Sequence, residues 1–379
     1  MKAIVNTTLV MTEYFIPDAA LIIDGDRISD FGPRKNFDLD GMEIIDAGGH
    51  FTGPGLIDIH THADGDHFFY EEPDVAAKTL LEHGVTSVLT ALYFNQDAKG
   101  LISQMKTIKE AAFSGKAPNI MGLYMEAPYM NPKFGCDREN NPWNGPIDKN
   151  DYMPILEEAG DFAKVWCLAP EREGIEGFVK DAKKINPKAV FSVAHSEATP
   201  QQVEALKRYG LKLATHHTNA TGTLAKYPEC RGVCVDEAAL YNNEIYTELI
   251  CDNVGIHVDP YMLRLVRKIK GDDKVILIAD SFVEHGPIPP GYDGADDINF
   301  DNMGEIAGTR LILDRACRNM IKHTGASLCQ AFKFGSTNPA TLLSLEDRGS
   351  IAIGNLADLV IVDYGFNVRS VIFRGEQVK

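Results

Sequence analysis

The sequence predicts an α/β protein: a (β/α)8 TIM barrel with a small β-sandwich domain built from both chain ends. Three observations lead to this prediction. Helical and β-rich runs alternate through the middle of the chain, polar residues recur where the β-rich runs end, and both termini have β patterns without a helical period. A length of 379 residues is sufficient for a barrel and a smaller second domain.

The two ends of the chain have the same β-rich character. Residues 1–52 alternate β-branched residues with turns, one of them at Asp24-Gly25. Near the C-terminus, "GSIAIGNLADLVIVD" and "VRSVIFRGEQV" are typical of strands joined by Gly and Asn turns. We therefore expect residues 1–52 and 345–379 to pair in one small β domain, and residues 53–344 to form the barrel.

The middle of the chain repeats a helix followed by a strand. The helical stretches "EPDVAAKTLLEHG", "TPQQVEALKRYG" and "PYMLRLVRKIKG" each end at glycine, a normal helix stop, and a β-rich run follows each. Repeated βα units favour a parallel sheet. An open doubly wound sheet is the alternative, but no G-x-G-x-x-G follows the first strand. The expected barrel strands lie near 57–62, 85–92, 120–126, 164–170, 189–195, 211–216, 248–251 and 275–280.

Composition and charge limit the possible partners. The formal net charge is -17, which repels nucleic acid and anionic membranes, so we expect neither as a partner. No run approaches the ~18 apolar residues of a membrane span, and the first residues lack a signal-peptide layout. The seven cysteines are scattered and odd in number, which is typical of a reducing, cytoplasmic setting.

Chemistry-bearing residues end most of the expected barrel strands. In "GPGLIDIHTHADGD", His60 and His62 lie two residues apart, so their imidazoles point the same way from a strand. Side chains at the carboxyl ends of barrel strands converge on one mouth. Any one of these residues alone would be an ordinary hydrogen-bonded side chain, but six at the same relative place predict a metal site. The four that end later strands are Glu126, His195, His216 and Asp280.

Imidazole and carboxylate ligands suit zinc or iron, although they also accept manganese or cobalt. Glu126, His195 and His216 can hold one divalent ion. His60 and His62 can hold a second, with Glu126 or water as the bridge. Asp280 would then act as general base toward water and afterwards as general acid toward the leaving group. Such a site is suited to hydrolysis of an amide or an ester.

These segments resemble the amidohydrolase superfamily and, within it, the N-acetylglucosamine-6-phosphate deacetylase family. The resemblance runs nearly end to end. It implies hydrolysis of the N-acetyl amide of N-acetylglucosamine 6-phosphate to glucosamine 6-phosphate and acetate, in amino-sugar catabolism, by a cytoplasmic homodimer. It also implies that Glu126 replaces the modified lysine ligand of many relatives, and that Asp280 is catalytic. The segments that carry it are "PGLIDIHTH", "MEAPYMNPKFG", "VAHSEAT", "THHTNATG", "NVGIHVDPYMLRL", "VILIADS" and "STNPATLLSLEDRGSIAIGNLADLVIVD".

The resemblance also implies a set of substrate-binding residues. Two segments depart from the family. Cys136 and Asp137 stand where the family has the end of Lys-Gly-Ala-His, whose histidine helps polarise the substrate carbonyl. The family arginine that helps hold the phosphate is absent after Asn219-Ala220, and Arg231 or Lys226 would replace it. The implied substrate-binding residues are Cys136, Asp137, Asn219, Ala220, Arg231, His257, Ile306, Ala307 and Gly308, with Gly308 allowing close backbone approach.

Two other functions stay open at this point. One is a related amidohydrolase that acts on N-acetylgalactosamine 6-phosphate, on an unphosphorylated sugar or on another N-acyl amine. The other is a catalytically silent barrel that serves as a binding protein, although all six expected metal and base positions are filled. Two more histidines lie near these segments: we expect His217 to point away from His216 and pack, and His285 either contacts substrate or is exposed.

Overall fold

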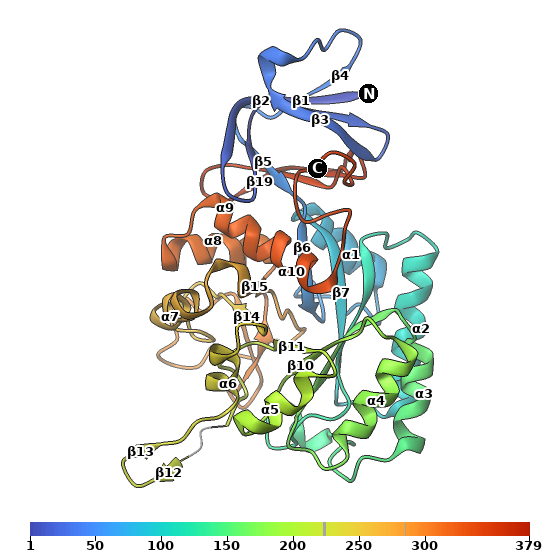
Figure 1. Ribbon diagram of the computed structural model, residues 1–379, viewed down its shortest axis with the longest axis vertical. Coiled ribbons are helices and arrows are strands. Elements are labelled where there is room, and N and C mark those ends of the chain that lie inside the picture. The colour runs from blue at the N-terminus through green and yellow to red at the C-terminus, as the bar shows by residue number, and fades with distance from the viewer. Residues whose placement is uncertain (223–224, 285) are drawn as a thin grey trace.

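The computed structural model describes residues 1–222, 225–284 and 286–379, and it contains a parallel barrel below a sheet made from the two chain ends (Figure 1). The parallel sheet has eight strands in the order in which they occur in the sequence. Every strand coincides with one of the predicted runs, so the predicted barrel is confirmed. The strands are β6 (Leu56–Thr61), β7 (Val85–Tyr93), β8 (Ile120–Glu126), β9 (Ala163–Leu168), β10 (Val190–Val193), β11 (Leu211–Ala214), β14 (Tyr246–Ile250) and β15 (Val275–Ile278).

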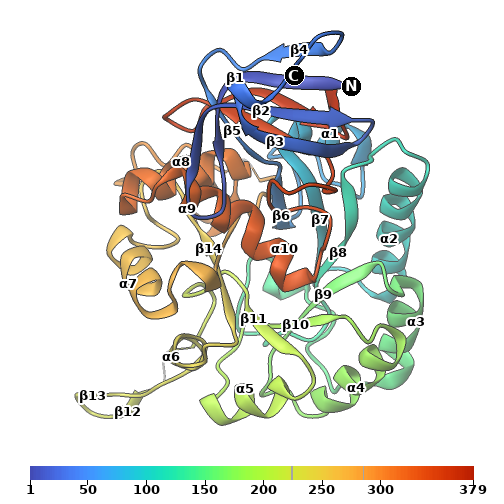
Figure 2. The same ribbon diagram turned by 45° about the horizontal axis from the view of Figure 1, so that its top comes forward.

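Helices surround the barrel and connect its strands (Figure 2). Local sequence signals fix their ends: Thr199 and Gln202 form a capping box at the start of α5, and α7 stops at Gly271, which has a φ of 68°. The barrel helices are α1 (Pro73–Glu82), α2 (Ala98–Phe113), α3 (Lys149–Ala159), α4 (Ile175–Ile185), α5 (Pro200–Lys207), α6 (Val235–Tyr241), α7 (Pro260–Lys270) and α8 (Leu313–Thr324). After them come α9 (Leu328–Phe332), the π-helical turn η4 (Lys333–Thr337) and α10 (Asn338–Leu343). Short 3₁₀ turns are η1 (Arg34–Asn36), η2 (Arg138–Asn140) and η3 (Asp272–Lys274).

The first and last barrel strands meet just beyond their carboxyl ends. The main-chain N–H of Asp280 donates to the carbonyl oxygen of His60 at 2.9 Å, and that of His62 donates to Ser281 at 2.9 Å. These two hydrogen bonds form the closing seam of the barrel. The seam therefore lies among the residues that the sequence predicts for the metal site, and it fixes His60 and His62 relative to Asp280.

The two chain ends form one mixed sheet (Figure 1), and this sheet has its own core. β5 unites the ends, because it pairs parallel with β1 and antiparallel with β18. This sheet runs to Pro54, and the domain division at residues 52 and 345 stays a prediction. The strands are β1 (Lys2–Val10), β2 (Phe15–Asp24), β3 (Arg27–Pro33), β4 (Glu43–Asp46), β5 (Phe51–Pro54), β18 (Leu359–Val362), β19 (Val368–Phe373) and β20 (Glu376–Gln377).

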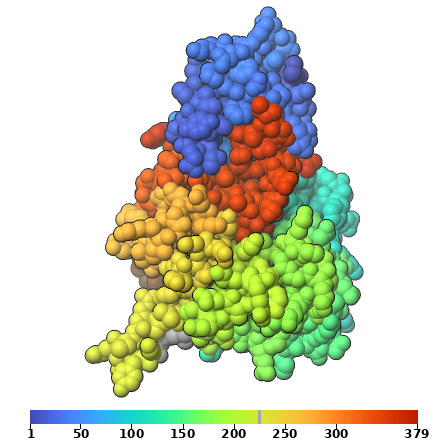
Figure 3. Space-filling model, in the orientation of Figure 1, coloured from blue at the N-terminus to red at the C-terminus, as the bar shows by residue number. Residues whose placement is uncertain are grey.

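Two hairpins interrupt the barrel pattern. β12 (Ala225–Tyr227) and β13 (Cys230–Arg231) form a ribbon that projects from the body of the protein (Figures 1 and 3). β16 (Ile298–Phe300) and β17 (Ile306–Thr309) lie beside the seam, where the N–H of Thr309 donates to the carbonyl oxygen of Asp280 at 3.0 Å. Among the helices of the described residues, none combines the length and apolar character that crossing a membrane requires.

Candidate metal centre and active site

The six predicted metal and base residues meet at the carboxyl-end mouth of the barrel, and the exposed fraction of none exceeds 9%. His60 lies on β6, Glu126 ends β8, and the other four follow strand ends. His195, His216 and Asp280 have φ values of 44°, 27° and 49°, in the left-handed region that side-chain-bearing residues rarely adopt. Such backbone strain is tolerated where the surrounding structure enforces it, and it clusters at functional sites.

One oxygen of Glu126 faces two histidines. Glu126 Oε1 lies 2.7 Å from His195 Nε2 and 3.1 Å from His216 Nε2. The two ring nitrogens lie only 3.1 Å apart. A neutral imidazole has one donor and one acceptor nitrogen, so this crowding leaves the three atoms imperfectly satisfied by one another. It is typical of ligands that converge on a shared cation.

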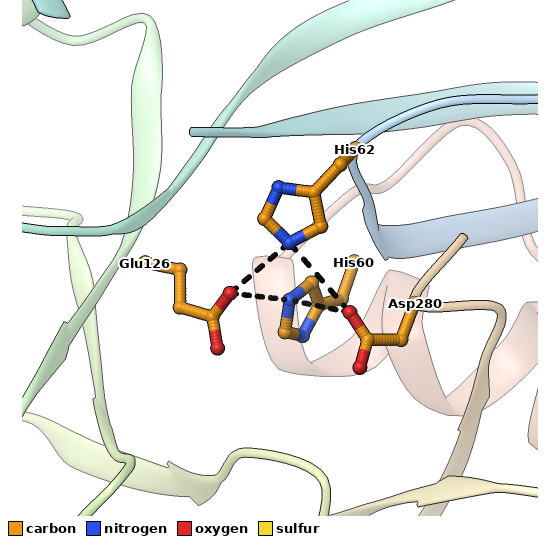
Figure 4. Close-up of side chains that lie close together, drawn as sticks. All are labelled: His60, His62, Glu126 and Asp280. Atoms are coloured by element: carbon orange, nitrogen blue, oxygen red, sulfur yellow. Dashed lines mark hydrogen bonds and ion pairs between the residues drawn. The ribbon is translucent and has the colours of Figure 1, made fainter. Parts of the chain in front are cut away.

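The other oxygen of Glu126 belongs to a second group of possible ligands, formed with His60, His62 and Asp280 (Figure 4). His62 Nε2 lies 3.0 Å from Glu126 Oε2 and 3.6 Å from Asp280 Oδ1. His60 Nε2 lies 3.5 Å from each of the same two oxygens. This nitrogen is buried and has no hydrogen-bond partner among the described residues. A bare buried nitrogen facing two carboxylates fits a cation position.

The donor set of the two groups fits one or two divalent transition ions. Four imidazole nitrogens and two carboxylates are ligands that zinc, iron, manganese and cobalt accept. Glu126 offers one oxygen to each group, so it can bridge two ions. A divalent ion in this site would polarise a bound carbonyl oxygen and lower the pKa of water.

Electrostatics keep the shared ligand ionised. Burial alone would raise the pKa of Glu126, but hydrogen bonds from the surrounding imidazoles, with His195 and His216 the strongest, hold it well below its usual range. Burial lowers the pKa of His195, which favours the neutral imidazole that binds metal. Glu126 therefore supplies this position with an anionic oxygen, and His195 supplies it with a neutral nitrogen.

A cavity of about 390 Å³ opens onto these ligands, within the range that binds small molecules. Six of the residues that the family resemblance implies for substrate binding line it: Cys136, Asn219, Ala220, His257, Ile306 and Gly308. Burial raises the pKa of the Cys136 thiol to about 12, so this side chain is neutral at physiological pH. Ala307 does not line the cavity, and its side chain is buried.

Asp137 does not line this cavity, and its contact with the substrate stays a prediction. Its backbone is left-handed, with a φ of 57°, and its carboxylate accepts hydrogen bonds from Asn95 at 2.9 Å and from Asn140 at 2.5 Å. The side chain is exposed and is turned away from the cavity that Cys136 lines. The carboxylate of Asp137 therefore does not oppose the development of negative charge on the substrate carbonyl oxygen.

Arg231 is also not at the cavity within a single chain. It lies on the projecting β12–β13 ribbon, its side chain is 85% exposed, and its guanidinium pairs with Glu237. The sequence signal was its position after Asn219-Ala220, but the ribbon carries it outward (Figure 1). Of the two remaining histidines, His217 is buried as expected, and His285 lies outside the described residues.

Sequence reasoning missed eight residues that line the cavity: Tyr93, Lys133, Phe134, Gly135, Arg138, Ile250, Phe282 and Glu305. Tyr93 and Phe282 place their rings against His62, with centroids 5.7 Å and 5.4 Å away. Tyr93 ends β7, so the strand-end rule that found the ligands could have found it too. Three of the others are charged, and no sequence signal was available for them: Lys133, Arg138 and Glu305.

Replacing Gly308 by alanine is expected to lower both stability and turnover. The φ of Gly308 is 69°, and an added Cβ would lie 2.8 Å from the carbonyl oxygen of Asp280. The left-handed conformation alone costs an alanine roughly 1–2 kcal/mol, and relief of the contact must displace Asp280. Gly304→Ala is the matched control, because its φ of 80° imposes similar strain while its nearest neighbour is 3.5 Å away. Thermal unfolding and kcat measured on both variants test this prediction, and equal kcat values would contradict it.

A parallel barrel with histidines and carboxylates gathered at the carboxyl-end mouth is the architecture of the barrel hydrolases that work with bound metal. The chain belongs to the amidohydrolase family, whose family model matches residues 52–378. The curated relatives described next cover 85% to 99% of the chain.

Two curated relatives are N-acetylglucosamine-6-phosphate deacetylases. That of Haemophilus influenzae is 26% identical over 99% of both chains, and that of Bacillus subtilis is 29% identical over 85% of this chain and 83% of its own. An N-acetylgalactosamine-6-phosphate deacetylase of Escherichia coli is 26% identical over 85% of this chain and 86% of its own. The solved N-acetylglucosamine-6-phosphate deacetylase of Pasteurella multocida superposes with a TM-score of 0.84, at 25% identity over 99% of both chains.

Proposed function

We propose that this protein hydrolyses the N-acetyl amide of N-acetylglucosamine 6-phosphate to glucosamine 6-phosphate and acetate, as a step of amino-sugar catabolism. One observation carries the proposal: a chain that aligns over 99% of its length with a deacetylase of this specificity also gathers a complete set of metal-type ligands at the mouth of a cavity. A silent binding barrel would have no need to keep every ligand.

In the proposed reaction one or two ions, with zinc or iron as the proposed metal, would be held by His60, His62, Glu126, His195 and His216. Asp280 then moves the proton. Its carboxylate lines the cavity beside the His60 and His62 nitrogens, so it can accept a proton from the attacking water. The new C–O bond forms first and makes the carbonyl carbon tetrahedral, and the amide C–N bond then breaks as Asp280 returns the proton to the departing amine.

The remaining cavity residues orient the sugar. His257 has its Nδ1 3.4 Å from Asp252 Oδ2, which can hold the ring in place with its other nitrogen available to the ligand. Asn219 and Ala220 line the same cavity. The phosphate needs a cation as well, because the net charge of -17 opposes a dianionic ligand.

Two cations of the cavity wall could serve the phosphate, and each is paired with a glutamate. Lys133 Nζ lies 2.5 Å from Glu197, and Arg138 makes two hydrogen bonds to Glu305, at 2.9 Å and 3.2 Å. We propose that Arg138 and Lys133, and not Arg231, contact the phosphate in a single chain. A phosphate would have to compete with the carboxylates for these groups.

The overall activity is tested by acetate release from N-acetylglucosamine 6-phosphate, N-acetylgalactosamine 6-phosphate and free N-acetylglucosamine. The expected result is the highest kcat/KM for the first. Preference for the free sugar, or no acetate from any of the three, would reject the proposed substrate.

The phosphate contact is tested by Arg138→Ala, which is expected to raise KM for the phosphorylated sugar by about tenfold and to leave the free sugar nearly unaffected. A charge-assisted hydrogen bond contributes roughly 1.5–3 kcal/mol, and the loss of the Glu305 pair places the effect at the low end. Glu305→Gln should act in the opposite direction, because it frees the guanidinium. Lys106→Ala removes an equal charge from the exposed face of α2 and is the control. A rise in KM with Arg231→Ala alone would favour the sequence-based assignment instead.

We also propose a cytoplasmic homodimer. Large apolar side chains support self-association through the projecting ribbon and the neighbouring α6, because Tyr227 is 74% exposed and Tyr241 is 81% exposed. Sedimentation of the purified protein tests this part, and a monomer at micromolar concentration would reject it.

A further inference from the structure

A buried carboxylate that does not line the cavity lies behind the metal-type ligands. Glu248 is on β14, and its exposed fraction is 0%. Its Oε2 lies 3.2 Å from Nδ1 of His60, the ring nitrogen that faces away from the other ligands. The Tyr124 hydroxyl donates to Oε1 at 2.9 Å, and the Tyr124 ring stacks on that of His60 with centroids 4.1 Å apart. The imidazole of His60 is thus held by Tyr124 on one ring face and by Glu248 at Nδ1.

We propose that Glu248 is a positioning residue for His60. By accepting the Nδ1–H proton it selects the tautomer in which Nε2 is bare and directed at the second cation position. A ligating histidine commonly donates its other N–H to a carboxylate in this way, and loss of such a partner typically weakens metal binding about 10- to 100-fold. The inference rests on the proposed role of His60 as a metal ligand.

The arrangement is asymmetric between the two cation positions. Nδ1 of His216 faces only the carbonyl oxygen of Asn219 at 3.3 Å, and Nδ1 of His195 has no hydrogen-bond partner in the part of the chain that the structure describes. Glu248 also accepts the main-chain N–H of His216 at 3.3 Å, but that bond does not act on the imidazole. Glu248 therefore acts on the cation position of His60 and His62 and not on that of His195 and His216. In the proposal, Glu248 controls whether a second ion binds.

Packing alone does not account for an acid at this place. A carboxylate without any exposure pays a desolvation cost that a neutral side chain of equal size would avoid. Neutral hydroxyl groups adjoin Glu248 on one side: Tyr124 bonds Thr215 at 2.7 Å, and Thr215 bonds Ser192 at 2.5 Å. A glutamine could join this network, so the negative charge itself is what the proposal explains.

The test is metal binding by wild type, Glu248→Gln and the control Ser192→Ala, which changes the same buried network without contacting His60. Each protein is stripped, titrated with zinc against a chelator of known affinity, and analysed for bound zinc per chain. The expected result is two ions in wild type and in Ser192→Ala. In Glu248→Gln one ion keeps its affinity and the other binds about 10- to 100-fold more weakly.

Several outcomes would overturn the proposal. Unchanged affinities in Glu248→Gln, or a wild type that holds only one ion, would remove Glu248 from this role, whereas a wild type that binds no zinc would reject the metal site itself. If Glu248→Gln does not fold, the zinc-loaded wild type still decides the matter. Its ¹⁵N imidazole resonances must show His60 protonated at Nδ1, and a His60 bonded to zinc through Nδ1 contradicts the inference.

Discussion

Glu126→Gln is expected to lose most of the bound metal and at least about 10³-fold in kcat/KM. The two oxygens of Glu126 face different histidine groups, with His195 at 2.7 Å and His62 at 3.0 Å. An amide supplies one neutral oxygen and turns two N–H donors toward nitrogens that must remain free to bind metal. Since a bound metal contributes several kcal/mol to charge stabilisation and ~1.4 kcal/mol is tenfold in rate, the loss of activity should be large.

Metal content and kcat/KM measured on the same preparation check this result. Glu171→Gln is the matched control, because Glu171 bonds Ser196 at 2.6 Å beside the site but contacts none of the predicted ligands. Wild-type metal content in Glu126→Gln would show that this carboxylate is not the shared ligand.

Asp280→Asn is expected to fold and to keep the ion held by Glu126, His195 and His216, while kcat falls by about 10²–10⁴. An amide cannot accept the proton of the attacking water. Asp280 Oδ1 also lies 3.5 Å from His60 Nε2, so the second position can lose affinity in this variant. The first position does not depend on Asp280, and metal analysis therefore separates a proton-transfer defect from loss of the site.

Asp137→Asn provides the comparison for Asp280→Asn. Asp137 is near the cavity in sequence but is bonded to Asn95 and Asn140, so its removal should leave kcat close to that of wild type. A normal kcat in Asp280→Asn would exclude it as the base. A large loss of kcat in Asp137→Asn would show that this side chain turns into the cavity when substrate binds.

The sequence predicted the barrel and the meeting of its six polar residues for a simple geometric reason. Parallel strands present their carboxyl ends on one side, so a residue such as His216 needs only a strand end to be placed in three dimensions. This rule applies to a strand end whatever the conformation of the loops between the strands. Residues whose position depends on loop conformation could not be placed in this way.

Arg231 and Asp137 illustrate that limit. The sequence-based predictions for both residues relied on their distance along the chain from family segments. Arg231 lies on the projecting β12–β13 ribbon, and Asp137 has a left-handed backbone that orients its side chain differently. Glu248 was missed for another reason. It lies within the buried run "YTELI" of β14. The alternation of side chains along a strand does not reveal which of these buried residues contacts the Nδ1 side of His60.

The seam between β6 and β15 has a consequence for folding during synthesis. His60 is synthesised in the first barrel strand and Asp280 just after the last, and their main chains bond directly to each other. Until β15 leaves the ribosome, the nascent chain holds five of the six groups without the neighbour that aligns them. Activity should therefore arise only after the ring has closed, so that hydrolysis reports this closure.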